Sequence, residues 1–275
     1  MYIGVDVGGT KTLLAVLNDD GVIQESTKFA TPQNYDHWLL ELKHAAQFLG
    51  HKDFKACGIG IPGDIDRRHG RGIKFGNLPW RNVPVQYDVE RAFNCPTVVE
   101  NDAKMACLSE AMLLKDKYQK VLYLTISTGI GMALVDHQKI VTDFGDRGGK
   151  GMLLEHQGKL VPWESYASGK AIYEKYGQKA KDITDEATWK AIVRNLVPGF
   201  LELIAMYEPD VVIVGGGVGT YFSRYKKILT DALKEYETPA LKIPPLRKAA
   251  RPEEAVIYGC YDLAKQTFSH GTTTK

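Results

Sequence analysis

The sequence predicts an α/β protein that consists of two similar halves. Segments with strand character alternate with segments of helical spacing, and 275 residues suffice for one large domain or two of ordinary size. One β-turn-β unit also occurs twice, over Ile3–Val16 and Leu122–Val135. In each copy an apolar run leads through a turn of small residues into a second apolar run. Because such a repeat indicates duplicated units, we expect two similar α/β domains that face each other across a cleft.

The expected elements of the first half follow from its apolar patterns. β-Branched and apolar runs bounded by turn residues predict strands, and the hairpin signal Asn18–Gly21 separates two of them. An apolar stripe from Trp38 to Leu49 has helical spacing. The resulting order is strands over 2–7, 12–17 and 22–28, a helix over 35–49, strands over 57–61 and 97–100, and a helix over 102–114.

The second half repeats the alternation. Its expected elements are a strand over 121–126, a long amphipathic helix over 189–207, a strand over 211–214, and helices over 222–236 and 253–268. We place one domain at residues 1–103, completed by the last helix, and the other at 104–252. The tail over 269–275 has no core-forming residues, so we expect it to be frayed.

Composition and charge exclude several classes of protein. Hydrophobic residues make up 44% and charged residues 25%, which excludes bulk disorder. The net charge of +2 gives no electrostatic case for binding nucleic acid or a membrane surface. No membrane span or signal peptide is visible. The four cysteines are far apart and form no CxxC pair, so we expect neither a cysteine zinc site nor a disulfide framework, and a cytoplasmic location.

Two glycine-containing turns are candidates for phosphate binding. Gly8 and Gly9 follow the strand that carries Asp6, and Ser127–Gly131 is the equivalent turn of the second half. Backbone N–H groups in such turns bind anions. Asp6 has the hard oxygen ligands that suit Mg²⁺, held through water. Either turn alone could be a plain hairpin, but their pairing favours phosphate binding.

A third glycine-rich turn, Gly215–Gly219, follows a strand and precedes a helix. It permits close packing of a flat ligand such as adenine. It is not a Walker A sequence, because no GK[ST] follows, and the first βα unit has no GxGxxG fingerprint.

Asp102 is the candidate catalytic carboxylate. It follows Glu100 and Asn101 where a strand ends and a helix begins, which is where α/β sheets bind ligands. There it could accept a proton from a substrate hydroxyl during phosphoryl transfer, or simply cap its helix. The residue pattern alone leaves both roles open.

The stretch Asn77–Trp80 reads as a rigid, aromatic-lined loop. Its asparagine can both donate to and accept from a sugar hydroxyl, although an ordinary turn with a buried tryptophan fits equally. Arg67 and Arg68 are expected to be solvated loop charges.

Six motifs together resemble the ROK family of sugar kinases, repressors and uncharacterised homologues. They cover nearly the whole chain in family order: Asp6–Lys11, Gly60–Gly63, Asn77–Trp80, Glu100–Ala103, Ser127–Gly131 and Gly215–Val218. The resemblance implies the actin-like, ribonuclease H-like and hexokinase-type ATPase fold, with duplicated βββαβα halves.

The resemblance also implies roles for particular residues. Asp102 looks like the catalytic base and a sugar ligand, and Asp6 like a magnesium ligand. The other implied sugar-binding residues are Asn77, Asn101 and Glu164. The implied phosphate-binding residues are Gly8, Gly9, Thr10, Lys11, Ser127, Thr128 and Gly129, and the adenosine loop is Gly215, Gly216 and Gly217.

Two departures from the family pattern concern the sugar pocket and zinc. Many members have a Glu-x-Gly-His segment where this chain has Gly149–Met152. They also have a cysteine cluster where residues 155–162 contain none. We therefore expect no zinc, and a sugar pocket that lacks two ligands unless Glu155 or His156 replaces them.

The resulting hypothesis is an ATP- and Mg²⁺-dependent hexose kinase, glucokinase-like, that phosphorylates the 6-hydroxyl. The alternatives are a kinase that uses polyphosphate and a non-catalytic, sugar-binding regulatory protein. A repressor would need a DNA-binding module ahead of the first strand, which here starts at Tyr2. The expected partner is a small-molecule sugar, with a homodimer as a possible assembly, and neither nucleic acid nor membrane.

Overall fold

The computed structural model describes residues 1–251 and 253–269. Residues 270–275, most of the predicted frayed tail, lie outside the described residues. The chain forms two compact units, one of residues 1–112 with 253–269 and the other of residues 113–251. The predicted boundary at residue 103 falls inside helix α3 (Asp102–Leu113), which belongs to the first unit up to Met112.

The first unit is built on a five-stranded mixed sheet. Its order is β3-β2-β1-β4-β8, in which β1 to β3 are antiparallel and β1, β4 and β8 are parallel. The carboxyl ends of the parallel strands therefore share one edge of the sheet. The strands are β1 (Tyr2–Val7), β2 (Lys11–Leu17), β3 (Ile23–Ala30), β4 (Ala56–Ile61) and β8 (Thr97–Asn101).

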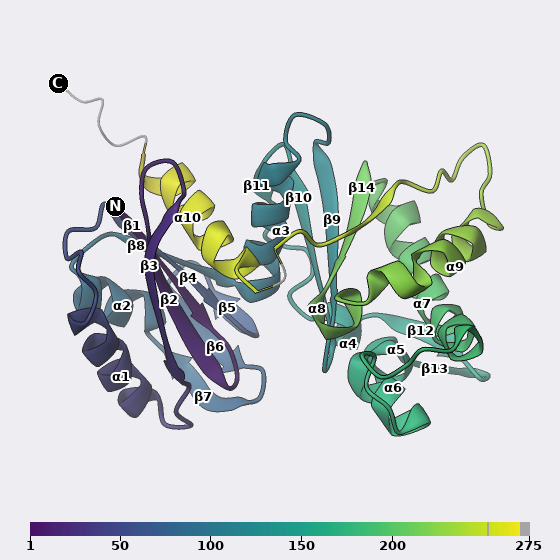
Figure 1. The fold of residues 1–275 in the computed structure, drawn as a ribbon, viewed down its shortest axis with the longest axis horizontal. Coiled ribbons are helices and arrows are strands. Elements are labelled where there is room, and N and C mark those ends of the chain that lie inside the picture. Colours follow the sequence, from purple (N-terminus) through teal and green to yellow (C-terminus); the bar gives the residue numbers. More distant parts are fainter. Residues whose placement is uncertain (252, 270–275) are drawn as a thin grey trace. The chain divides into compact units, whose positions relative to one another are not determined.

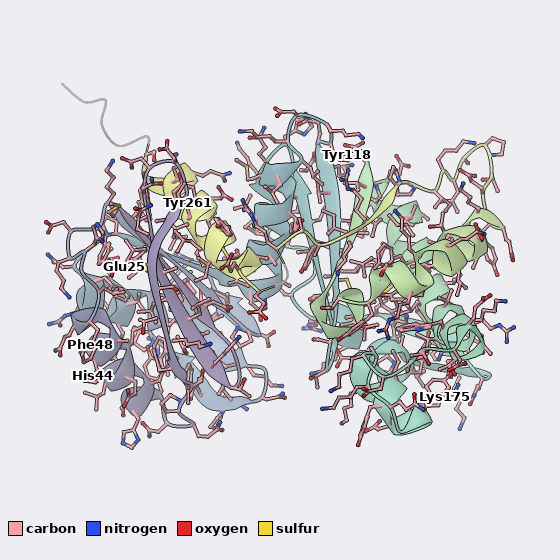
Figure 2. The ribbon with its side chains drawn as sticks, viewed as in Figure 1. Glu25, His44, Phe48, Tyr118, Lys175 and Tyr261 are labelled. Atoms are coloured by element: carbon pink, nitrogen blue, oxygen red, sulfur yellow. The ribbon has the colours of Figure 1, made fainter. Side chains whose placement is uncertain are left out.

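Helices cover the two faces of this sheet. On one face, α1 (Tyr35–Gln47) and α2 (Val85–Phe93) bury apolar side chains against the strands. On the other, α10 (Ala255–Phe268) packs on β1 and β4, so the yellow and purple ends of the chain lie side by side in Figure 1. Tyr261 of α10, labelled in Figure 2, meets the Tyr2 ring edge-on and donates a 2.7 Å hydrogen bond to the Asp19 carbonyl.

A small three-stranded sheet lies between β4 and α2 in the chain. It consists of β5 (Asp64–Asp66), β6 (Arg71–Phe75) and β7 (Leu78–Val83). The prediction of a loop over residues 77–80 is wrong for residues 78–80, because strand β7 begins at Leu78. Short, partly exposed strands such as these carry little periodic signal.

The second unit repeats the sheet of the first. Its order is β11-β10-β9-β14-β15. As in the first sheet, the first three strands of this order pair antiparallel and the last three pair parallel. The prediction of two duplicated halves is therefore confirmed. The strands are β9 (Lys120–Ile126), β10 (Ile130–Asp136), β11 (Lys139–Ile140), β14 (Val211–Gly215) and β15 (Leu246–Lys248).

The core of the second unit forms where α7 (Glu186–Tyr207) and α9 (Phe222–Lys234) pack together. Trp189 of α7 stacks on Tyr225 of α9 with 4.7 Å between ring centroids. Its smaller elements are α4 (Gly148–Gly151), the hairpin β12 (Leu153–His156) and β13 (Lys159–Pro162), α5 (Glu164–Ala167), α6 (Gly169–Tyr176) and α8 (Gly216–Gly219). Within the described ranges, no helix combines the length and apolarity that crossing a membrane requires.

Candidate functional site

Asp102 lies at the carboxyl edge of the first sheet, and its neighbour caps the helix. The Asn101 side-chain oxygen accepts from the backbone N–H groups of Ala103 at 2.9 Å and Lys104 at 3.3 Å. The Asp102 carboxylate accepts from Ala103 N–H through Oδ1 at 2.7 Å. Since Asn101 performs the capping, Oδ2 of Asp102 is available to a substrate hydroxyl.

Asn101 also forms a hydrogen bond to the turn that follows strand β4. Its amide nitrogen donates to the Gly63 carbonyl at 3.3 Å. Gly63 has φ +98°, and a Cβ there would lie 2.0 Å from the Lys74 carbonyl oxygen, so only glycine fits. Asn101 therefore joins α3 to the turn over residues 62–63, and its side chain is already engaged in the protein.

Glu100 fixes the strand that precedes Asp102. Its carboxylate is 3% exposed and accepts two 2.7 Å hydrogen bonds from the Arg67 guanidinium. It also accepts from Asn101 N–H at 2.6 Å. The expectation that Arg67 is a solvated loop charge is wrong, because this bidentate pair compensates a buried carboxylate.

Asp6 and Asp102 form a pair of carboxyls whose pKa values are both raised. Burial raises the pKa of Asp102 to about 6, against the opposing effect of the Ala103 N–H bond. Burial, with the charge of Asp102, raises the pKa of Asp6 to about 7, against the opposing charge of Lys11. Both carboxyls are half-buried, and a nearby cation would favour their ionised forms.

The turn after Asp6 is held in shape by Thr31. Gly8 N–H donates to the Lys11 carbonyl at 2.9 Å, which closes the turn. The Thr31 hydroxyl donates to the Gly8 carbonyl at 2.8 Å, and Thr31 N–H donates to the Thr10 carbonyl at 3.0 Å. Gly9, Thr10 and Lys11 are exposed, so this braced turn presents them to an anion.

Asn77 and Trp80 have different environments. Asn77 is exposed in the turn between β6 and β7. Trp80 is 3% exposed, packs against Trp38 and Phe75, and donates to the Gln33 carbonyl at 3.0 Å. Asn77, unlike Trp80, is therefore free to contact a ligand.

The equivalent turn of the second unit is held from two sides by the segment around α5. Gly169 N–H donates to the Ser127 carbonyl at 2.7 Å. The Glu164 carboxylate accepts from Ile130 N–H at 2.8 Å. A Cβ on Gly129 would lie 2.4 Å from a Glu164 carboxylate oxygen, so glycine permits this approach. Glu164 therefore contacts the Ser127–Gly129 turn in this structure.

The triple glycine lies at the carboxyl end of β14. Gly216 has φ +78°, and a Cβ there would lie 2.6 Å from the Ile126 carbonyl oxygen. A Cβ on Gly215 would lie 2.1 Å from the Tyr123 hydroxyl oxygen. Gly217 has open space around it and lines a pocket. The first two glycines thus permit close backbone packing, and the third leaves room for a ligand.

That pocket has a volume of about 520 Å³ and lies wholly in the second unit. The turn of Ser127 and Thr128 forms one part of its lining, and two tyrosines and three lysines form others. Aromatic and apolar walls suit a flat ligand such as a nucleoside base. The lining residues are Ser127, Thr128, Gly169, Lys170, Tyr173, Lys179, Ala180, Lys181, Gly217, Val218 and Tyr221.

Comparison with known proteins gives the family. The model of the ROK family matches residues 2–267. This chain belongs to the ROK family. The N-acetyl-D-glucosamine kinase of Histophilus somni is 29% identical over 303 residues, with 94% of this chain and 97% of that protein covered. The glucokinase of Streptomyces coelicolor is 27% identical over 261 residues, with 79% and 82% covered.

A solved structure agrees over nearly the whole length of this ROK protein. It is a ROK family glucokinase from Streptomyces griseus in complex with glucose and AMPPNP. Its TM-score is 0.79 at 25% identity, with 96% of this chain and 99% of that chain covered. The predicted actin-like ATPase fold is thereby confirmed.

The two candidates for replacing the missing sugar ligands make other contacts in this ROK protein. The Glu155 carboxylate accepts from Gly158 N–H at 2.6 Å within its own hairpin. The His156 ring stacks on Tyr166 at 4.0 Å. Gly149 is buried, and a Cβ there would lie 2.9 Å from Ile130 Cβ and 3.2 Å from Glu164 Cβ. A glutamate at position 149 would therefore require its neighbours to move.

Protein purified without a chelator is expected to contain much less than one zinc ion per chain. A structural zinc needs about four converging ligands, and His156 is the only cysteine or histidine between residues 149 and 166. Across residues 1–251 and 253–269, no three histidine, cysteine or acidic side chains converge. Elemental analysis is the measurement. A stoichiometric zinc would show that ligands are recruited from other parts of the chain.

Several residues of the candidate site were missed by sequence reasoning. Thr31 is one, because its partners Gly8 and Thr10 lie more than twenty positions away. Tyr173 is another, and its 51% exposure became visible only in the structure. The lysines of the pocket resemble ordinary surface charges in the sequence. No local pattern distinguishes them.

Proposed function

We propose that this ROK protein is an ATP- and Mg²⁺-dependent kinase of hexoses. It transfers the γ-phosphoryl group of ATP to the 6-hydroxyl of a glucose-like sugar. The proposal rests on one observation about Asp102. Asn101 caps helix α3, so the Asp102 carboxylate is not needed for capping and can contact a substrate. The named activities of the glucokinase and N-acetylglucosamine kinase relatives support the same conclusion.

Each unit would contribute part of the binding machinery. The first unit carries the proposed base Asp102, the sugar-contacting Asn77 and Asn101, and the turn Gly8–Lys11 for phosphate. The second carries Glu164, the turn Ser127–Gly129 and the nucleoside pocket beside Gly215–Gly217. Asn101 and Glu164 already make hydrogen bonds within the protein, so they would contact the sugar with their remaining polar atoms.

In the proposed reaction Asp102 acts as the general base. The sugar hydroxyl oxygen forms a bond to the γ-phosphorus, the bond from that phosphorus to the β–γ bridging oxygen breaks, and the hydroxyl proton passes to Asp102. A pKa of about 6 leaves this carboxylate ionised at neutral pH and still basic enough to accept the proton. Backbone N–H groups of the two turns would bind the phosphoryl oxygens.

The donor set of the first unit fits Mg²⁺. This ion commonly keeps several waters and takes one or two carboxylates plus substrate phosphates. Asp6 would hold it through water, and the charge of the ion would oppose the burial that raises the pKa of this carboxyl. When bound, the ion neutralises charge on the transferring phosphates.

Assaying the protein with ATP and with polyphosphate tests the proposal. The tyrosines of the 520 Å³ pocket favour ATP, because polyphosphate has no base or ribose to contact them. We expect sugar-dependent formation of ADP and a sugar phosphate. Turnover with polyphosphate alone would favour the first alternative. Sugar binding without turnover from either donor would favour a regulatory protein.

Weak sugar discrimination is expected at the ring end remote from the phosphorylated hydroxyl. Gly149 has no side chain there and Met152 cannot act as an imidazole donor, whereas a site that hydrogen-bonds a hydroxyl rejects analogues lacking it by about 10⁴-fold or more. The measurement is a KM series over glucose, mannose, N-acetylglucosamine and fructose. We expect KM values above those of relatives that have both ligands.

Met152→His is the matched variant for that series, because it restores one ligand without the clash expected at position 149. It should lower KM for the preferred sugar and sharpen the selection. Selection of one sugar by about a hundredfold or more in the unchanged protein would show that other groups complete the pocket.

A further inference from the structure

Arg224 lies behind the wall of the nucleoside pocket, in the first turn of α9. Its Nη1 donates to three backbone carbonyls of the α6–α7 connection, those of Ala180 at 3.3 Å, Lys181 at 2.9 Å and Ile183 at 2.7 Å. Ala180 and Lys181 line the pocket, and Arg224 does not. One guanidinium thus holds the backbone of a pocket wall from outside.

The same guanidinium also contacts a second pocket wall. Its Cζ lies 4.6 Å from the centroid of the Tyr221 ring, which is a cation–π geometry. Tyr221 lines the pocket, and so does Val218, whose carbonyl lies 3.5 Å from the hydroxyl of the buried Tyr225. The first turn of α9 therefore joins the α6–α7 connection to the residues that follow the triple glycine.

The connection held by Arg224 buries the Ala180 and Ile183 side chains in the core, but few other hydrogen bonds hold its backbone. Residues 179–183 form a turn with one internal backbone bond, Asp182 N–H to the Lys179 carbonyl at 2.8 Å. Trp189 Nε1 adds a 3.2 Å bond to the Ile183 carbonyl. Lys179 and Lys181 are exposed. Loss of Arg224 would thus remove the side-chain donor to the Ala180 and Lys181 carbonyls.

Two other cations of α7 and α9 pair with carboxylates of their own helices. Lys190 pairs with Glu186 at 2.7 Å, and Lys227 pairs with Asp231 at 2.6 Å. Arg224 differs because its partners are carbonyls of another segment. A planar guanidinium can also stack on a ring while it donates in its plane, which an ammonium cannot do.

We infer that Arg224 is a positioning residue for the nucleotide, and that it sets the affinity for ATP without touching it. The inference rests on the proposed function. The Ala180–Lys181 backbone and the Tyr221 ring form walls of one pocket, and Arg224 fixes both. Its loss should therefore weaken nucleoside binding and leave the sugar and base residues of the first unit unchanged.

The test compares Arg224→Gln with Lys227→Gln. Both remove one cation from α9, three residues apart, but Lys227 pairs with Asp231 of its own helix. Arg224→Gln should raise KM and Kd for ATP on the order of tenfold, which corresponds to about 1.4 kcal/mol. The kcat at saturating ATP and the KM for sugar should stay within about twofold. Hydrogen exchange over residues 179–184 should rise, and Lys227→Gln should match the unchanged protein throughout.

Calorimetric titration of the unchanged protein with ATP distinguishes failure of the proposed function from failure of the role inferred for Arg224. If the unchanged protein binds no ATP, both the proposed function and the role of Arg224 are wrong. If it binds ATP but Arg224→Gln keeps the same KM, or loses kcat and sugar affinity equally, only the role of Arg224 is wrong. Should Arg224→Gln not fold, Arg224→Lys decides, since it keeps the charge but cannot stack on the ring and donate to the carbonyls at the same time. An increase in its KM for ATP supports the inference, and an unchanged KM overturns it.

Discussion

Asp102→Asn is expected to lower kcat by about a hundredfold or more, because general bases contribute rate factors of about 10² to 10⁴. Asparagine has nearly the same shape but cannot accept the hydroxyl proton. The fold should survive, because Asn101 and not Asp102 caps α3 through Ala103 and Lys104. The melting temperature should be unchanged or higher, since the variant removes a carboxylate whose ionisation burial disfavours.

Asp36→Asn is the matched control for this variant. Asp36 is also an acidic residue in the first turn of a helix, and that helix is capped by the separate residue Asn34. It should keep full kcat. The pH profile gives an independent check, because Asp102 must be ionised: kcat/KM should rise with pH through about 6 and then level off. Near-normal turnover in folded Asp102→Asn protein would remove Asp102 from the mechanism.

Asp6→Asn is expected to change activity and stability in opposite directions. The activity should fall by about tenfold or more, because the proposed magnesium ligand is lost. The stability at pH 8 should rise, with a melting temperature about 2–4 °C higher, the shift that about 1 kcal/mol produces in a protein of this size. The gain arises because the folded state no longer holds a half-buried charge.

The sign of the pH dependence follows from the raised pKa of Asp6. Between its ordinary pKa of 3.8 and its folded value of about 7, the folded state binds more protons than the unfolded state. Wild-type stability therefore falls as pH rises through this window. The advantage of Asp6→Asn should be full at pH 8, shrink below pH 7 and vanish near pH 4.

Thermal melts between pH 4 and pH 8 in the absence of Mg²⁺ and nucleotide make the comparison. Asp20→Asn is the control, because Asp20 is an exposed carboxylate in the hairpin turn of the same unit. The Asp20→Asn variant should have the same melting temperature as the unchanged protein at every pH. A destabilised Asp6→Asn protein, or one with an advantage that does not depend on pH, would contradict the electrostatic account of this carboxyl.

The regular elements were predictable because their signal is local. The strand predicted at 97–100 occurs at Thr97–Asn101, and the helix predicted at 189–207 occurs at Glu186–Tyr207. The duplicated turn predicted two similar sheets because both copies have the same short pattern. The small sheet of residues 64–83 was missed, since three short strands joined by tight turns leave little periodicity.

The roles of individual polar residues were less predictable because their partners are distant in sequence. Asn101 and Asp102 are both good capping residues, and only the hydrogen bonds show that Asn101 caps. Arg67 pairs with Glu100, 33 residues away. Tyr173 and Tyr221 line one pocket although 48 positions separate them. Such pairs depend on the tertiary fold, and no sequence window contains both members.

The position of α10 has a consequence for the synthesis of this protein. The second unit is continuous in sequence, so all of its described residues have been translated before Ala255 is added. The first unit has one face of its central sheet covered by residues 255–268, including Ile257 and Tyr261. While the ribosome builds the intervening residues, that face lacks its apolar cover. The first unit therefore cannot complete its folding until residues 255–268 have been translated, and a translation pause before Ala255 would prolong the exposure of that face to chaperones and proteases.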